Sequence, residues 1–279
     1  MMLKVTTPLV SVEWLQENLE AENLIILDAT IPKVGGAIDI TKEKQQIKNA
    51  VFFDLKNVFL DVKGEYPNTI PSKEHFEEQV QKLGVNNDSC VVVYDDLGVY
   101  SSPRVWWLFN VFGFKNIAVL NGGLPAWKEA GYAVEFQKEN KIEQGNFKAE
   151  FKENLLRVTE QVLEASNNKE LILDARSKGR FDATESEPRK DLRSGHIPNS
   201  KSLPYGMLQS DGNMKSAKEL QQLFSLVNPE KEHMTFSCGS GITACILALG
   251  AEASGYTNYS VYDGSWTEWG SRLELPVEK

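Results

Sequence analysis

Short apolar runs rich in β-branched residues alternate along the chain with longer amphipathic stretches. The apolar runs lie at residues 24–29, 90–95, 117–120, 171–175, 234–237 and 259–264. Continuous apolar strands separated by helices are typical of parallel sheets that are covered on both faces. The pattern therefore predicts an α/β fold built on parallel sheets flanked by helices.

The order of these segments repeats in the second half of the chain. The string ILDA at residues 26–29 returns at residues 172–175, and NGGLPAW at residues 121–127 returns as DGSWTEW at residues 263–269. Short strings such as ILDA also recur by chance in α/β proteins. Several features in the same order nevertheless favour a tandem duplication.

A charged segment separates the two copies. Residues 136–154 are poor in branched apolar residues, as is typical of a linker. We therefore expect two domains, at residues 1–135 and 155–279, joined by this linker.

The composition is that of a globular protein, since 41% of the 279 residues are hydrophobic and 25% are charged. The formal net charge is −9 and no run of Lys and Arg is dense, which argues against a nucleic-acid partner. The N-terminal stretch has no continuous apolar run, so neither a signal peptide nor a membrane span is indicated. These features predict a cytoplasmic protein with no membrane partner.

The cysteine count bounds the chemistry. The chain has three cysteines, Cys90, Cys238 and Cys245, at separations without a zinc-type spacing. An odd number cannot form a disulfide framework and suits a reducing compartment. We therefore expect free thiols, with neither a bound metal nor a cofactor.

One cysteine opens a glycine-rich loop between an apolar strand and a segment of helical spacing. The loop reads Cys238, Gly239, Ser240, Gly241, Ile242 and Thr243. The two glycines allow successive N–H groups to point at the sulfur, and the following helix adds its positive partial charge. This cradle favours a thiolate, and equally the outer sulfur of a persulfide. The alternative is a buried structural cysteine beside an ordinary turn.

Protein phosphatases use a similar cysteine loop, but they need an arginine after five intervening residues, because that arginine clamps two phosphate oxygens. The corresponding residue here is Ala244. The loop is one residue too short and lacks the clamp, so a phosphatase is disfavoured and a smaller ligand, a single sulfur atom, is favoured.

The strand–CGSGIT–helix unit, the sequence GHIP at residues 195–198 and the duplication together resemble the two-domain rhodanese superfamily. The resemblance covers nearly the whole chain. It implies two tandem rhodanese-like domains and a sulfurtransferase that works through a Cys238 persulfide. Within that family, the loop of this chain is similar to that of 3-mercaptopyruvate sulfurtransferases, because the residues after the cysteine, Gly239 and Ser240, are neutral. Thiosulfate sulfurtransferases carry basic residues at these positions.

The implied reaction takes sulfur from 3-mercaptopyruvate, releases pyruvate and passes the sulfur to a thiol, a thioredoxin-like protein or cyanide. Thiosulfate as the donor remains an alternative, although such a dianion would profit from charge inside the loop, where Gly239 and Ser240 are neutral. A further alternative is a non-catalytic sulfur-carrier or regulatory binding module.

Two arginines lie in residues 178–189, a stretch expected to form a long loop after the strand at residues 171–175. Arg180 and Arg189 resemble the paired arginines that bind the substrate carboxylate and ketone in mercaptopyruvate sulfurtransferases, and a planar guanidinium suits such bidentate recognition. Arg176 is expected to pair with a neighbouring acid. His196, within GHIP, is expected to be structural.

The first repeat lacks a cysteine at the loop position, where it reads YDDLGVYSSPR at residues 94–104. The first domain is therefore expected to be catalytically inactive and to contribute one wall of a cleft between domains. Asp95 and Asp96 are expected to be solvated loop acids, and Trp106 and Trp107 to be core residues.

The resemblance also implies a Ser-His-Asp triad that assists the donor. Ser240 matches the serine and Asp54 matches the acid, but Asn68 stands where the histidine is expected. An amide can orient a hydroxyl or a substrate, but it cannot accept a proton. Asn68 is therefore expected to contact the substrate, and the proton relay is left open.

Overall fold

The computed structural model describes residues 2–32, 44–137 and 142–279. The chain divides into two compact units. The first comprises Met1–Leu60, Pro71–Phe151 and Asp211–Met214, and the second comprises Asp61–Ile70, Lys152–Ser210 and Lys215–Lys279. The expected linker at residues 136–154 stays a prediction, and its residues 138–141 lie outside the described part of the chain.

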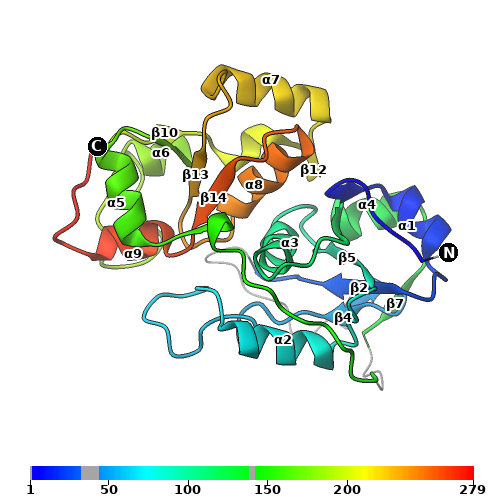
Figure 1. The fold of residues 1–279 in the computed structure, drawn as a ribbon. Coiled ribbons are helices and arrows are strands. Elements are labelled where there is room, and N and C mark those ends of the chain that lie inside the picture. Colours follow the sequence, from blue (N-terminus) through cyan, green and yellow to red (C-terminus); the bar gives the residue numbers. More distant parts are fainter. Residues whose placement is uncertain (1, 33–43, 138–141) are drawn as a thin grey trace. The chain divides into compact units, whose positions relative to one another are not determined.

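The first unit is built on a parallel sheet of five strands (Figure 1). In spatial order they are β1 (Leu9–Val10), β6 (Ile117–Leu120), β5 (Cys90–Tyr94), β2 (Leu24–Asp28) and β4 (Val51–Phe52). The central strand β5 is buried along its whole length, as its apolar sequence predicts. A short antiparallel pair, β3 (Gln45–Ile47) and β7 (Val134–Phe136), belongs to the same unit.

Helices flank this sheet. They are α1 (Val12–Asn18), α2 (Lys73–Lys82), α3 (Ser102–Val111) and α4 (Gly123–Glu129), and the unit also holds the strand β12 (Asn213–Met214). Ser11 and Ser72 cap α1 and α2 by accepting a backbone N–H with their hydroxyls. Trp106 and Trp107 are buried, which confirms that they are core residues.

The second unit repeats this plan. Its parallel sheet has the spatial order β10 (Lys201–Ser202), β9 (Leu171–Asp174), β13 (Met234–Ser237), β14 (Tyr259–Tyr262) and β8 (Leu156–Arg157). Its helical segments are η1 (Glu153–Leu155), α5 (Thr159–Asn167), α6 (Lys178–Phe181), η2 (Tyr205–Leu208), α7 (Ala217–Val227), α8 (Ala244–Ala253) and α9 (Ser265–Ser271), and β11 (Gln209–Ser210) completes the unit.

The two sheets have the same strand order along the chain, which confirms the α/β fold and supports the duplication. Strands β1, β2, β4, β5 and β6 of the first unit correspond to β8, β9, β10, β13 and β14 of the second. Equivalent helices cover equivalent faces, because α1 and α4 pack on one face of the first sheet and α5 and α9 on that of the second. Within the described residues, no helix is long and apolar enough to cross a membrane.

Candidate active site

Cys238 lies at the carboxyl end of β13, the central strand of the second sheet. It is followed by the loop at residues 239–243 and then by α8. The cysteine is free and 1% exposed. The carboxyl ends of parallel strands are the usual place for ligands in α/β folds. The strand, loop and helix expected from the sequence are therefore present.

The loop is fastened to the start of α9. The backbone N–H of Trp266 donates to the Cys238 carbonyl oxygen at 2.9 Å, and that of Thr267 donates to the Gly239 carbonyl oxygen at 2.9 Å. The Ser265 hydroxyl accepts the N–H of Cys238 at 3.1 Å. These contacts fix the backbone on which the thiol is carried.

Beyond the cysteine, the loop leaves its own donors open. Among the described residues, the backbone N–H groups of Gly239, Ser240, Ile242 and Thr243 have no hydrogen-bond acceptor. Gly241 has a φ of 77°, a left-handed conformation that lets the chain curl back. Donors without acceptors at the start of a helix are the requirement for an anion cradle.

The first unit fills the equivalent cradle with its own carboxylate. Asp28 pairs with Tyr94 as Asp174 pairs with Ser237, so Asp95 occupies the place of Cys238. The Asp95 carboxylate accepts the backbone N–H groups of Leu97, Tyr100, Ser101 and Ser102 at 2.8–3.0 Å, and the Ser102 hydroxyl at 2.7 Å.

The prediction that Asp95 is a solvated acid is therefore wrong. Its side chain is buried because the short loop places it among these donors, and only Asp96 is exposed. A carboxylate held by several N–H groups is an anion in an anion site. The same loop architecture in the second unit carries a sulfur in place of the carboxylate.

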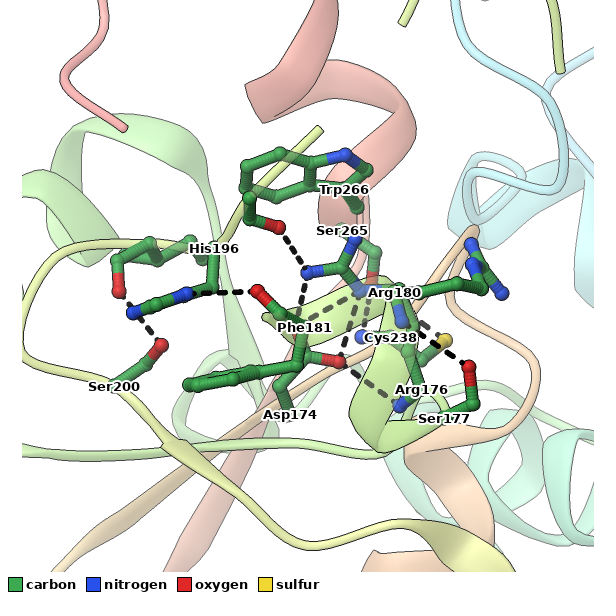
Figure 2. Close-up of polar contacts among 12 residues, drawn as sticks. Asp174, Arg176, Ser177, Arg180, Phe181, His196, Ser200, Cys238, Ser265 and Trp266 are labelled. Carbon is green, nitrogen blue, oxygen red and sulfur yellow. Dashed lines mark hydrogen bonds and ion pairs between the residues drawn. The ribbon is translucent and has the colours of Figure 1, made fainter. Parts of the chain in front are cut away.

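An arginine pair lies beside the cysteine loop, linked by Glu187. Arg176 donates to Asp174 at 2.6 Å and its guanidinium stacks on Trp266 at 4.3 Å (Figure 2). It also donates to Glu187 at 2.7 Å. Burial opposes the positive charge of Arg176, but Asp174 and Glu187 outweigh it and raise the pKa of the guanidinium. The expected pairing of Arg176 with an acid is confirmed.

Arg180 is held by the same carboxylate. Its Nη2 and Nε donate to the Glu187 carboxylate at 2.5 and 3.3 Å. It lies on α6, a helical turn where the sequence suggests only a loop, and the Ser177 hydroxyl caps that turn. A Cβ atom built on Gly239 would lie 3.1 Å from Arg180 Nη2, so the guanidinium rests against the cysteine loop. A glycine at this position makes that approach possible.

Ser240 accepts hydrogen bonds from two other residues that the sequence predicts for the site, Arg189 and Asn68. Arg189 Nη2 donates to the Ser240 hydroxyl at 3.2 Å, and Asn68 Nδ2 donates to the Ser240 carbonyl oxygen at 3.1 Å. Asn68 reaches the loop because Asp61–Ile70 folds with the second unit. Arg189 has no carboxylate partner in the described part of the chain.

Asp54 and His196 have hydrogen-bond partners outside the cysteine loop. Asp54 belongs to the first unit, where its carboxylate accepts the N–H groups of Lys56 and Asn57. His196 stacks on Phe181 at 3.8 Å and its Nδ1 bonds to the Phe181 carbonyl oxygen, which fits a structural role. Among the described residues, no group of three or more His, Cys, Asp or Glu side chains could hold a metal ion.

Sequence reasoning missed two residues of this site, Glu187 and Ser265. Glu187 stands within the arginine stretch, but its sequence position does not reveal that it bridges two guanidinium groups. Ser265 stands opposite Gly123 when NGGLPAW is written above DGSWTEW, and that exchange was an available signal.

Fold and site together define a two-domain α/β protein whose second domain carries a cysteine at the head of a loop with open backbone donors. Residues 11–130 and 158–272 each match the family described as "Rhodanese-like domain". The chain therefore belongs to this family, as the sequence predicts.

Relatives of known activity match nearly the full length of this chain. "Thiosulfate/3-mercaptopyruvate sulfurtransferase 1, mitochondrial" of Arabidopsis thaliana is 40% identical, with 99% of this chain and 79% of the relative covered. "3-mercaptopyruvate sulfurtransferase" of Escherichia coli K12 is 35% identical, with 98% of each chain covered. "Thiosulfate sulfurtransferase" of Gallus gallus is 38% identical, with 94% of this chain and 92% of the relative covered.

Solved structures lead to the same family. The 3-mercaptopyruvate sulfurtransferase SseA from Escherichia coli has a TM-score of 0.82 at 32% identity, covering 94% of this chain and 99% of its own. The Tum1 protein from Saccharomyces cerevisiae has a TM-score of 0.86 at 30% identity, covering 98% of both chains. The predicted pair of rhodanese-like domains and the predicted sulfurtransferase class are thereby confirmed.

Proposed function

We propose that this sulfurtransferase takes sulfur from 3-mercaptopyruvate through a persulfide on Cys238 and releases pyruvate. One observation carries the proposal. The loop after Cys238 presents backbone donors that have no acceptor in the described residues, where the first domain places a carboxylate. An outer persulfide sulfur is an anion small enough for this cradle, with Gly239, Gly241, Ile242 and Thr243 supplying its backbone.

The donor carboxylate would be bound by Arg180 and Arg189. Arg189 carries a charge that no described carboxylate neutralises, while Arg180 keeps guanidinium hydrogens beyond those given to Glu187. Both arginines contact or approach the cysteine loop, so a three-carbon mercapto acid bound to them would place its sulfur near Cys238.

The first half-reaction then balances as a single displacement. The Cys238 thiolate attacks the donor sulfur, an S–S bond forms, and the C–S bond breaks with its electron pair moving to the enolate of pyruvate. The hydrogen of the donor thiol stays on the outer sulfur during the displacement and is then lost to solvent, which leaves the anionic persulfide. The enolate takes a proton from solvent and leaves as pyruvate.

The second half-reaction returns the enzyme to its starting state. A thiolate acceptor, from a small thiol or a thioredoxin-like protein, or cyanide, attacks the outer sulfur, and the Cys238 thiolate leaves. A reducing compartment such as the cytoplasm would suit this cycle, because the active form needs Cys238 as a thiol outside any disulfide.

Asn68 and Ser240 would orient the donor rather than relay a proton. Asn68 cannot accept a proton, and the Ser240 hydroxyl already accepts a hydrogen from Arg189. The Ser240 hydroxyl hydrogen would therefore point to the donor ketone or thiol. Asp54 remains the candidate acid that the family resemblance suggests.

Thiosulfate is the second candidate donor, because a thiosulfate sulfurtransferase is among the relatives of similar identity. The close approach of Arg180 to Gly239 disfavours it. A basic side chain in place of Gly239 would bring its Cβ to 3.1 Å from Arg180 Nη2 and set two like charges side by side, whereas the present arginines suit a carboxylate.

Intact mass after incubation with 3-mercaptopyruvate tests the proposal. We expect the wild type to gain one sulfur atom with stoichiometric pyruvate release, and Cys238→Ser to gain none and to release no pyruvate. Cys90→Ala, which removes a buried thiol of the first domain, should behave as the wild type. An unmodified wild-type mass would contradict the proposal, and a higher kcat/KM for thiosulfate would favour the second donor.

A further inference from the structure

The two domains treat one backbone position differently. The N–H of Leu124 donates to the Asp95 carbonyl oxygen at 2.9 Å, and the N–H of Trp266 donates to the Cys238 carbonyl oxygen at 2.9 Å. Since Asp95 occupies the place of Cys238, the residues before these donors, Gly123 and Ser265, also correspond. Their φ angles are 55° and 51°.

A left-handed φ suits glycine and is rarely adopted by a residue with a side chain. The first domain has a glycine, Gly123, at this position, so its left-handed φ costs little. The second domain keeps the same backbone but accepts a serine, which is fully buried. A strained backbone conformation of this kind is retained where the side chain has a role of its own, and such conformations are most frequent at functional sites.

The Ser265 side chain lies against the reacting sulfur. Its Oγ accepts the N–H of Cys238 at 3.1 Å, which holds the hydroxyl beside the cysteine (Figure 2). Two acceptors are then in reach of its single hydrogen, the Tyr262 carbonyl oxygen at 2.8 Å and Cys238 Sγ at 3.8 Å. A hydroxyl hydrogen serves only one of them well at a time.

The charge on the sulfur decides between these acceptors. A neutral thiol or disulfide-type sulfur is a weak acceptor, so the hydrogen stays on the carbonyl oxygen, as the shorter distance indicates. A buried thiolate is a strong acceptor and has lost its hydration, so it competes with the carbonyl for the hydrogen.

We propose that Ser265 is a catalytic residue, whose hydroxyl turns from the Tyr262 carbonyl to the Cys238 sulfur whenever that sulfur is a thiolate. This inference rests on the proposed persulfide cycle and deepens it. The thiolate occurs twice in the cycle, as the attacking group of the first half-reaction and as the leaving group of the second. Ser265 therefore accelerates both halves through one contact.

The test compares Ser265→Gly with the wild type. Glycine fits the left-handed φ and copies the first domain, so this variant removes the hydroxyl without adding strain. We expect about a tenfold slower alkylation of Cys238 by iodoacetamide at neutral pH, the effect of losing one hydrogen bond to a charged group. The pH profile of alkylation should move to higher pH, and the two proteins should converge in alkaline solution.

Matched variants separate chemistry from packing. Ser237→Ala alters the residue next to Cys238, and its buried hydroxyl has no partner in the described part of the chain, so its alkylation profile should equal that of the wild type. Ser265→Ala keeps a Cβ in the left-handed conformation, so it should show the same slow alkylation together with a lower melting temperature than Ser265→Gly.

The kinetic readout is a fall in kcat of similar size with little change in KM for the donor. An unchanged alkylation profile in Ser265→Gly would overturn the inference. Alkylation requires no sulfur donor, so a failure of the wild type to form a persulfide would refute the proposed function without affecting this result.

Discussion

The Glu187 carboxylate holds two guanidinium groups that differ in exposure. Arg176 is fully buried and also pairs with Asp174, whereas Arg180 is partly exposed and faces the cysteine loop. The Glu187 side chain is 2% exposed, so its charge is compensated by both arginines at once. Glu187 therefore fixes the direction of Arg180.

Replacing Glu187 with glutamine should expose that positioning role. An amide offers one acceptor oxygen in place of two, so Arg180 loses its fixed direction while Arg176 keeps Asp174. We expect KM for 3-mercaptopyruvate to rise about tenfold with a smaller change in kcat, and stability to fall by roughly 2 kcal/mol.

Steady-state kinetics and urea unfolding measure these two effects separately. Glu185→Gln is the matched control, since Glu185 lies in the same segment but is exposed, and its carboxylate accepts only the Ser177 hydroxyl within the described residues. Its KM should stay at the wild-type value. A stability loss in Glu187→Gln without any change in KM would reduce Glu187 to a structural residue.

At the scale of elements, the apolar runs were sufficient to locate the central strands, because a strand covered on both faces has to be apolar throughout. The loop at residues 238–243 was also predictable from its glycines. The path of Asp61–Ile70 was not, because a segment without periodicity carries no signal of the sheet that it joins. Asn68 was consequently named from family resemblance, while its contact with Ser240 needed the fold.

The burial of Asp95 was missed for a related reason. An acid among glycine, serine and tyrosine residues has the composition of an exposed loop, and only the curled backbone shows that its donors converge on the carboxylate. The charge of Asp95 is therefore part of the first domain's framework, in the place where the second domain would hold its sulfur.

Asp95→Asn should accordingly destabilise the first domain. The amide nitrogen would face donors that now share one carboxylate oxygen, namely three backbone N–H groups and the Ser102 hydroxyl. We expect a loss of about 3 kcal/mol in urea unfolding, because buried donors are left without an acceptor. The exposed Asp96→Asn is the control and should change stability little.

The kcat of Asp95→Asn tests whether the first domain takes part in catalysis. If that domain is catalytically inactive, as the missing cysteine predicts, Asp95→Asn should keep the wild-type kcat under conditions where it is folded. A large fall in kcat in folded Asp95→Asn protein would show that the first domain takes part in the chemistry.

At the scale of the whole molecule, the duplication has produced two similar sheets whose cradles carry different charges. In the first, the anion is built into the chain and the donors are satisfied before any ligand arrives. In the second, the donors stay open and the neighbouring arginines supply the positive charge. The chain as a whole carries a net charge of −9, so an anionic donor would be attracted by this local cluster and not by the overall field.

The pH dependence of folding should also differ between the two domains. His233 precedes β13 in the second domain, and its buried Nδ1 has no hydrogen-bond partner in the described residues. Burial, together with nearby Arg157, lowers the pKa of His233 from its usual value of 6.5. Between the two pKa values the unfolded chain binds more protons than the folded one. Stability is therefore full above the unfolded value and is lost as the pH falls below it.

Amide hydrogen exchange in β13 and β14 reports this loss within the second domain. We expect protection there to drop between about pH 8 and about pH 5.5 in the wild type, and to drop less in His233→Gln, which cannot acquire a charge. His75→Gln provides the control, because His75 lies in the first domain on α2. Protection that falls equally in the wild type and in His233→Gln would assign the acid sensitivity of the second domain to its carboxylates instead, starting with the Asp174–Arg176–Glu187 cluster.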